Sequence, residues 1–580
     1  MGFLTELIQN AIKALSRFPI TLSWAVLGSF FLIVNSGNDH ISLVLILGVS
    51  WLIAVQFISE ALNHTTIYRF LLKIFILGGL AGFYFYLEQP EINNSNIAIG
   101  QWLLLLLAGH VFVIFAPFFN TWHKSRFWNF LKEIAISLLR SAIYSFILFL
   151  GLALAVAALD FLFDIKLNSD IYLQIFIFCL GIINTFIFLR DFPKADELEI
   201  TIHFNKAIAV LLKYILIPLS LLYIIIVYVY AVKILLSWEL PRGWVTYLIS
   251  ALSFLAFVIH IAIEPVRIKH PSKLIQKFFP LYFYAILPLL PLLFIALFKR
   301  ISDYNFTELR YLGLVLALWI SGMLLYMLIS KKKRLSLYAK FMFLLILICT
   351  FGPLSAFKIS LSAQLQELGE LLDDLDTKKE LSFKPQEYER FESVIKYINN
   401  RKALEKTEPY FGFNPEIAFS ETGSYRMPRK IVDSLGIRVE NVKERNLNRV
   451  KNYVQYTFKP NFAEEITTYT HFTELDLDEG FKKEQALQLC FNDENIISFR
   501  HYGEPLLETN MTSHLKTLGD KYDYLSQASQ DEFTFRYKNE NGDFLLIFNQ
   551  LQFYYQNREV QIRSGKAKVF YKTYSALELP

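Results

Sequence analysis

Long apolar segments with few charges recur up to residue 357 and then stop. A helix needs roughly 20 apolar residues to cross a bilayer, and eleven segments approach this length, the first and last being the shortest. The pattern therefore predicts a polytopic all-α membrane bundle of about eleven transmembrane helices over residues 18–357. The predicted spans are 18–34, 41–59, 70–87, 102–119, 141–163, 171–189, 214–232, 244–263, 278–298, 311–330 and 341–357.

The residues before the first span have a one-sided apolar pattern. Leu4, Ile8, Ile12 and Leu15 recur at helical spacing, with polar residues between them. Such a helix buries one face in the headgroup region without crossing the bilayer. We therefore predict an interfacial amphipathic helix over residues 1–17.

After the last span, leucines recur every three or four residues from Leu361 to Leu375 on an acidic segment. This stripe predicts a helix that packs on its own domain, and self-association through two heptads is the alternative. Further helices are expected at 386–405 and 429–434. We interpret residues 358–405 as a helical connector.

The last part of the chain changes to a period of two residues. Phe533, Phe535 and Tyr537 alternate with polar residues, and Asn541-Gly542 separates them from a second apolar run, which predicts a β-hairpin. We predict a soluble α+β domain with a mainly antiparallel sheet over residues 406–580. Further strands are expected at 453–458, 466–474, 486–491, 495–501, 551–555, 559–563 and 567–572.

Composition agrees with a membrane protein and exposes a division in charge. The chain is 54% hydrophobic and 16% aromatic, values typical of the membrane class. Residues 1–360 hold 28 Lys+Arg and 17 Asp+Glu (+11), and the remainder holds 29 and 35 (−6), which together give the net +5. The positive excess lies in loops between spans, where membrane topology explains it. We therefore exclude nucleic acid as a partner.

The same charges orient the bundle. A cytoplasmic N-terminus places 21 of those 28 basic residues in cytoplasmic loops, which is the bias that orients membrane proteins. An odd number of spans then places residues 406–580 outside the cytoplasm.

Few polar residues lie deep in the predicted spans. His110 is near the middle of its span and Gln56 lies nearer one end, but no carboxylate occupies a comparable depth. A pump built on a buried Asp or Glu is therefore disfavoured. The prolines of the ninth span, Pro280, Pro288 and Pro291, favour a broken helix, a feature that lines transport sites in many carriers.

Two loops carry a recognisable pattern: Trp238 to Trp244, and Arg300 to Tyr311. Together with Gly352-Pro-Leu-Ser355, Ser362 and Gln364, they resemble the bacterial membrane-protein family catalogued as domain of unknown function 4153, over roughly residues 1–370. The resemblance implies a multi-pass protein of the bacterial inner membrane and supplies no catalytic residues. In such a cell, the outer position predicted from loop charge makes the C-terminal domain periplasmic or extracellular. Asn305 departs from the family pattern, in which glycine is expected at a tight turn.

Both loops fall on the predicted outer face, so their charged side chains form a candidate binding site. One interpretation is that the aromatic residues anchor the interface and the charges pair locally. The other is that the arginines bind an anionic group such as a lipid phosphate, which suits their planar donors. The candidate residues are Glu239, Arg242, Arg300, Asp303, Glu308 and Arg310.

Three functional hypotheses remain open. The leading one is a non-enzymatic envelope protein that displays a partner-binding domain. The second is a transporter or lipid-handling protein with an anion site on the outer face. The third is a membrane-embedded enzyme, which needs Glu239, Asp303 or Glu308 to converge in one cleft. The sequence lacks GxSxG, P-loop, HExxH and CxxC motifs, so we expect no cofactor and no metal.

Overall fold

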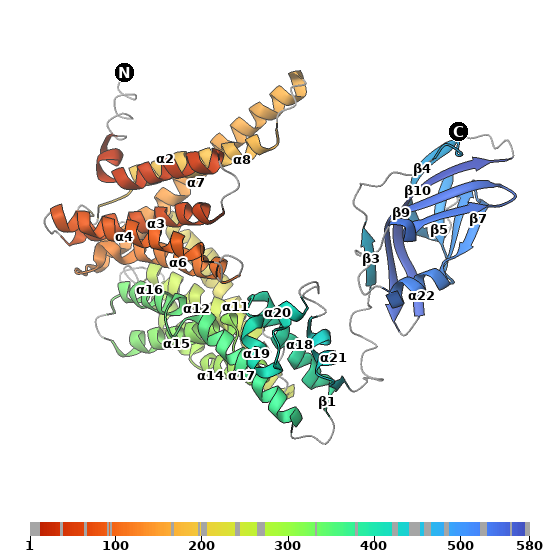
Figure 1. Cartoon of the computed structure of the whole chain (residues 1–580). Helices are drawn as coiled ribbons and strands as arrows, with labels where there is room; N and C mark the ends of the chain where they lie inside the picture. The colour runs from red at the N-terminus through yellow and green to blue at the C-terminus, as the bar shows by residue number, and fades with distance from the viewer. Residues whose placement is uncertain are drawn as a thin grey trace. The chain divides into compact units, whose positions relative to one another are not determined.

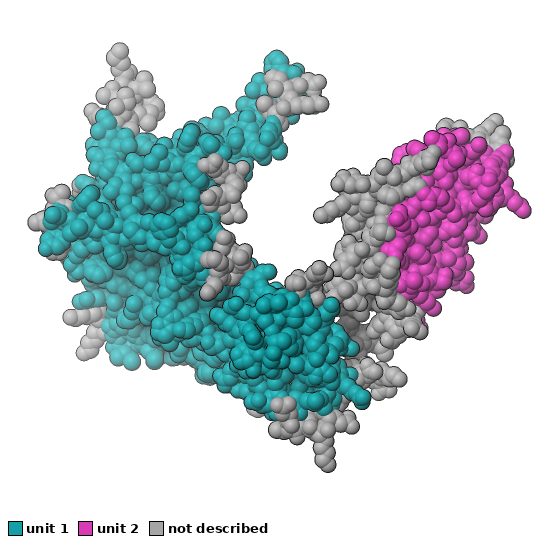
Figure 2. Space-filling view, in the orientation of Figure 1, with its two compact units in different colours: residues 1–441 teal, residues 442–580 magenta. Residues whose placement is uncertain are grey.

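The fold is known from a computed structural model that divides into two compact units, residues 1–441 and residues 442–580 (Figure 2). The residues that the structure describes are 12–34, 39–62, 66–89, 92, 96–163, 168–194, 198, 206–237, 244–263, 273–330, 333–376, 381–419, 427–439, 453–457, 466–480, 486–521, 530–556 and 559–574.

The first unit begins with a bundle of apolar helices (Figure 1). Each predicted span overlaps a helical segment, so the all-α membrane bundle is confirmed. Within the described part of the chain, six segments are uninterrupted α-helices that are long and apolar enough to cross a membrane. They are α3 (Asp39–Ala61), α4 (Thr66–Leu87), α6 (Ile97–Phe115), α7 (Lys124–Phe163), α12 (Trp244–Ile263) and α15 (Glu308–Ile329).

Three further segments of that length contain an interruption. Two widen into a π-helical turn, and the third breaks beside a proline. They are α8, η2 and α9 (Asp170–Ile177, Phe178–Asn184 and Thr185–Arg190), α10, η3 and α11 (Lys206–Val210, Leu211–Leu216 and Ile217–Ser237), and α13 and α14 (Lys273–Ile286 and Leu289–Tyr304).

The number of long spans differs from the expected eleven. Among the described residues, nine helical segments are long enough to cross a membrane. The first and last predicted spans correspond to α2 (Pro19–Val34) and α16 (Ser336–Thr350), with 16 and 15 residues. At 1.5 Å per residue these helices are about 24 Å long, shorter than the hydrocarbon core of about 30 Å.

The broken ninth span is stabilised by a neighbouring helix. Pro288 lies at the break between α13 and α14, because proline lacks the amide hydrogen that continues a helix. The Tyr228 hydroxyl of α11 donates a 2.7 Å hydrogen bond to the Ala285 carbonyl just before this break. The Ala285 carbonyl, which the break leaves within the membrane region, thus has a hydrogen-bond donor from the protein itself.

An ion pair between Arg17 and Glu60, just before the N-terminal end of α2, holds the start of the described chain. Residues 12–17 are helical, and the Arg17 guanidinium donates to both Glu60 carboxylate oxygens at 3.0 and 2.9 Å. The same guanidinium donates to the Phe192 carbonyl at 2.6 Å. The predicted interfacial helix therefore lies only partly within the described residues, and its last turn is fastened to α3.

After α16 the chain forms what we call the helical layer, residues 356–439 (Figure 1). Its core contains Leu368, Leu371 and Leu375 of the leucine stripe, together with Phe391 and Ile395. The stripe therefore packs against other helices of the helical layer, in the same unit as the membrane bundle. The elements are α17 (Ala356–Asp376), α18 (Pro385–Asn400), η4 (Leu404–Thr407), α19 (Glu408–Phe411), α20 (Pro415–Ala418), α21 (Met427–Ser434), and the parallel pair β1 (Ser382–Phe383) and β2 (Arg438–Val439).

In its described residues the second unit is an eight-stranded sheet with one α-helix, α22 (Thr512–Lys521), and a short 3-10 helix, η6 (Gln530–Phe533). The strands follow the order β3-β9-β10-β4-β5-β6-β7, and β8 pairs with β9. All described pairs are antiparallel except β4 with β5, so the mainly antiparallel sheet is confirmed. The strands are β3 (Tyr453–Thr457), β4 (His471–Glu479), β5 (Leu487–Phe491), β6 (Ile496–His501), β7 (Glu504–Asn510), β8 (Thr534–Lys538), β9 (Gly542–Gln556) and β10 (Glu559–Thr573).

The predicted hairpin is also confirmed. β8 and β9 are joined by a turn in which the Asn539 amide donates to the Gly542 carbonyl at 3.0 Å. The Asn539 side-chain oxygen accepts the amides of Asn541 and Gly542 at 2.9 and 3.1 Å. An asparagine that bonds its own backbone in this way stabilises a tight turn.

Candidate functional site

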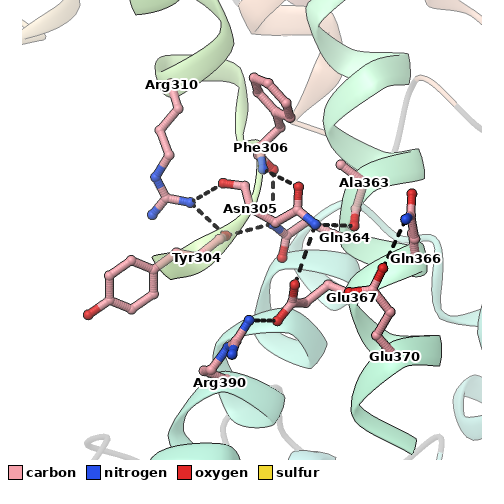
Figure 3. A network of polar contacts seen from close by, with 10 residues as sticks. All are labelled: Tyr304, Asn305, Phe306, Arg310, Ala363, Gln364, Gln366, Glu367, Glu370 and Arg390. Carbon is pink, nitrogen blue, oxygen red and sulfur yellow. Dashed lines mark hydrogen bonds and ion pairs between the residues drawn. The ribbon is translucent and has the colours of Figure 1, made fainter. Parts of the chain in front are cut away.

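The loop between α14 and α15 turns through one residue in an unusual conformation. Asn305 has φ 54° and ψ −174°, a region that favours glycine. Its side chain stabilises the turn from within, because Oδ1 accepts the Phe306 amide at 2.8 Å. Nδ2 donates to the Ala363 carbonyl of α17 at 3.1 Å (Figure 3). The tight turn expected from the family pattern is therefore present with asparagine in place of glycine.

The carbonyl groups of this turn are all bound by side chains. Gln364 of α17 is buried and donates from Nε2 to the carbonyls of Tyr304 and Phe306, at 3.1 and 2.9 Å (Figure 3). Arg310 donates from Nη1 to the carbonyls of Tyr304 and Asn305, at 2.9 and 2.8 Å. Arg310 thus binds the C-terminal end of α14, where a cation is favoured by the helix dipole.

One carboxylate extends the network into the helical layer. Glu367 of α17 is 5% exposed and forms an ion pair with Arg390 of α18. Its other oxygen accepts a hydrogen bond from Asn305 Nδ2 at 3.4 Å (Figure 3). A buried carboxylate is stable only when it is paired and hydrogen-bonded, so Glu367 connects the turn to α18.

A second contact lies at the first residue of α15. Glu308 Oε1 is 2.5 Å from Arg401 Nη2 and accepts a 2.5 Å hydrogen bond from the Tyr397 hydroxyl. The Arg401 guanidinium lies 5.5 Å from the ring centres of both Tyr397 and Phe357. Burial raises the pKa of the Tyr397 phenol above its usual range, and the hydrogen bond to the Glu308 carboxylate raises it further. Tyr397 therefore remains a donor to Glu308.

The other predicted residues of this loop are placed differently. Asp303 forms a 2.9 Å ion pair with Lys299 one helical turn away, and both side chains are solvent-accessible. Arg300 is half-buried and lies close enough to Arg310 for their charges to interact. Neither arginine has a carboxylate partner among the described residues.

The two remaining candidates, Glu239 and Arg242, lie outside the described residues, as does most of the Trp238 to Trp244 loop. The described carboxylates Asp303 and Glu308 each have a separate cationic partner. The described part of the site therefore holds its acidic groups in ion pairs and leaves two arginines without an acidic partner.

Sequence reasoning missed Glu367, Arg390, Tyr397 and Arg401. One local signal was present for Glu367, because Ser360, Gln364 and Glu367 recur at positions i, i+4 and i+7 of α17 and all three are buried. A polar stripe beside a leucine stripe indicates that a helix packs against polar groups on a second face.

These features define the class of protein: a multi-pass membrane protein whose α14–α15 loop is bound by helices that come after the last apolar helix. The family described as "Domain of unknown function (DUF4153)" matches residues 11–360, which is more than half of the chain, and the protein belongs to this family. The resemblance seen in the sequence is therefore confirmed.

One curated relative is an uncharacterised protein of Pasteurella multocida (strain Pm70). It is 26% identical over 307 residues, which cover 50% of this chain and 49% of the relative. The chain thus spans about half the length of the curated relative that it matches. No solved structure matches the chain.

Proposed function

We propose that this protein is an envelope protein whose membrane bundle anchors an outer domain that binds a partner. The observation that carries the proposal is the pair of contacts between the bundle and the helical layer. Gln364 and Glu367 bind the Asn305 turn, and Arg401 binds Glu308 at the start of α15. A loop that only closed two spans would not need buried partners from a later segment, so these contacts fit a bundle that anchors the helical layer.

The charge distribution supports an outer position for the helical layer. The α14–α15 loop belongs to the loops that hold only 7 of the 28 basic residues before residue 361. Loops poor in Lys and Arg face away from the cytoplasm. The helical layer, bound to this loop, then lies outside the cytoplasm together with the C-terminal part of the chain.

The second unit has a partly exposed aromatic cluster suited to a protein partner. Phe472 on β4 is 56% exposed, and its ring centre is 4.8 Å from that of Phe570 on β10. Tyr469 lies beside them, 6.5 Å from Phe570. Aromatic residues are enriched at the centres of protein interfaces, so we assign partner binding to this cluster.

The first test is the orientation. Single cysteines at Asn541 and Lys333, in a chain without Cys179, Cys349 and Cys490, are treated in intact cells with a membrane-impermeant thiol reagent. The proposal expects labelling at 541 in intact cells, and labelling at 333 only after the membrane is permeabilised. Labelling at 333 alone would place the helical layer in the cytoplasm and overturn the proposal.

The second test is the partner. A photoreactive amino acid replaces Phe472, and a matched control replaces Glu540, an exposed residue of the β8–β9 turn. The proposal expects a discrete protein adduct from position 472 that the substitution F570S reduces strongly, and no such adduct from position 540. Identical adduct patterns at both positions would contradict a binding role for the aromatic cluster.

A second candidate function, binding of an anionic lipid, rests on Arg300 and Arg310. They lie on either side of the α14–α15 turn, Arg300 in α14 and Arg310 in α15, without carboxylate partners among the described residues. Asp303 and Glu308 are neutralised by other cations. Native mass spectrometry with phosphatidylglycerol and phosphatidylcholine tests it: R300A should lower retention of the anionic lipid several-fold, and R300K should lower it less. Equal retention by R300A and the control K299A would exclude the site.

A further inference from the structure

His110 is an ionisable residue on the outer surface of the helical bundle. It is the fourteenth residue of α6, which begins at Ile97, and therefore lies about 20 Å along that helix at 1.5 Å per residue. Its side chain is exposed. Ionisable residues within membrane helices almost always face the bundle interior or a water-filled cavity, so this position needs an explanation.

The hydrogen bond that His110 makes fixes its tautomer. Nδ1 lies 2.7 Å from the Leu106 carbonyl oxygen, and a carbonyl only accepts, so Nδ1 carries the hydrogen. In the neutral ring Nε2 is then an acceptor, and among the described residues no donor is bonded to it. An unsatisfied acceptor in hydrocarbon is unfavourable.

The residues around His110 form an apolar face on α6. Leu103 and Leu107 precede it by seven and three positions, and they are 53% and 50% exposed. The face is thus a stripe of two leucines and one hydrogen-bond acceptor. A second transmembrane helix with small or branched side chains against the leucines and one donor at the depth of the histidine would satisfy this acceptor.

We propose that the face formed by Leu103, Leu107 and His110 packs against a transmembrane helix of another polypeptide, which donates a hydrogen bond to His110 Nε2 from a hydroxyl, amide or ammonium group. A second copy of this chain using the same face is a poorer fit, because a two-fold axis would place two Nε2 acceptors opposite each other. The partner is a membrane subunit, and its binding does not depend on the aromatic cluster of the second unit.

The test is photocrosslinking of the full chain in native membranes. A photoreactive amino acid replaces Leu107, and the control replaces Leu154, which is 62% exposed on α7. The expected result is an adduct at 107 whose peptide maps to one transmembrane segment containing a polar donor. H110L should reduce its yield at least tenfold, and H110Q, whose amide oxygen still accepts, should retain most of it.

Three outcomes would overturn the proposal. Lipid adducts alone at 107, as at 154, would show that the face is covered by bilayer. A protein adduct of equal yield in H110L would show that the histidine does not contribute. Labelling of a cysteine at 107 by an aqueous thiol reagent would show a water-filled cavity instead. Because His110 is exposed, all variants should keep the thermal stability of the parent chain.

Discussion

Glu308 and Arg401, 93 positions apart, meet in a 2.5 Å ion pair in which both side chains are largely buried, with 14% and 13% exposed. Glu308 is the first residue of α15, and Arg401 comes directly after α18. The start of a membrane helix is thus fixed to a residue of the helical layer. A carboxylate at this position is favoured by the N-terminal end of the helix dipole, and the arginine supplies its counter-charge.

The first prediction concerns this ion pair. R401A should lower the free energy of unfolding by about 3 kcal/mol, because it leaves a largely buried carboxylate without its cation. K299A, which breaks the exposed pair with Asp303, is the control and should cost less than about 1 kcal/mol. Reversible unfolding in mixed micelles measures the free energy of unfolding of both variants. Equal losses in R401A and K299A would contradict a stabilising role for the ion pair between Glu308 and Arg401.

The helices of the bundle could be predicted because each apolar run carries its own signal. The contacts of Glu308 could not be predicted, because Tyr397 lies on α18 and Arg401 directly after it, 89 and 93 positions away in sequence. Sequence reasoning therefore identified Glu308 as a charged residue of interest without its partners. Arg390 and its partner Glu367, 23 positions apart, were both missed for the same reason.

The sheet shows where local patterns fail. Strands were expected to break between residues 548 and 551 and between 563 and 567, but β9 and β10 each continue through 15 residues. Both expected breaks lie at β-bulges, where the register shifts near Asn549 and Arg563. A bulge interrupts the alternation of side chains without ending the strand. β7 was missed because Pro505 and the pair Leu506-Leu507 disrupt a period of two.

The second prediction concerns Asn305. N305A removes the side-chain hydrogen bonds to Phe306, Ala363 and Glu367 but keeps the Cβ at φ 54°. The backbone strain is then no longer offset, and the change should cost about 2 to 3 kcal/mol. N305G loses the same bonds but relieves the backbone, and should cost about 1 kcal/mol. Thermal unfolding of both variants in detergent compares these two losses of stability. A smaller loss for N305A than for N305G would refute the role of backbone strain.

The third prediction separates two glycines of the bundle. A Cβ at Gly109 would lie 2.3 Å from Ser50 Oγ and 2.8 Å from the Trp51 ring, whereas at Gly78 no atom lies within 4 Å. G109A should therefore destabilise the bundle by about 1 to 3 kcal/mol through overpacking. G78A should be neutral or stabilise α4 by up to about 1 kcal/mol. Melting temperatures of the two variants in one detergent test the contrast, and an equal loss would contradict close packing of α6 on α3.

The fourth prediction is that residues 442–580 fold alone. The unit has its own core, which includes the fully buried rings of Phe499, Phe544, Phe548 and Phe553. The isolated segment should unfold cooperatively in urea, as followed by circular dichroism, and F548A should cost about 3 to 5 kcal/mol. A segment that lacks a cooperative transition would show that this unit depends on the rest of the chain.

The last prediction concerns the pH response of the same unit. The Tyr574 hydroxyl donates a 2.8 Å hydrogen bond to Asp543 Oδ2, and Lys538 Nζ lies 3.4 Å from Oδ1. The hydrogen bond from Tyr574, aided by the Lys538 charge, holds the pKa of the Asp543 carboxyl below its usual range. The folded unit therefore binds this proton less readily than the unfolded chain. The resulting stability is present above about pH 4, near the ordinary aspartate pKa, and is lost as pH falls through the lowered value.

Removing one hydroxyl tests this relationship. Y574F keeps the ring and should raise the pKa of Asp543 toward the ordinary aspartate value, since the donor that stabilises the carboxylate is gone. Carboxyl carbon chemical shifts followed against pH in the isolated unit, or in the full chain if the unit does not fold alone, give the pKa directly. K538M, which removes the charge but keeps the hydroxyl, should raise the pKa of Asp543 less than Y574F. An Asp543 pKa that is unchanged in Y574F would assign the shift to another group.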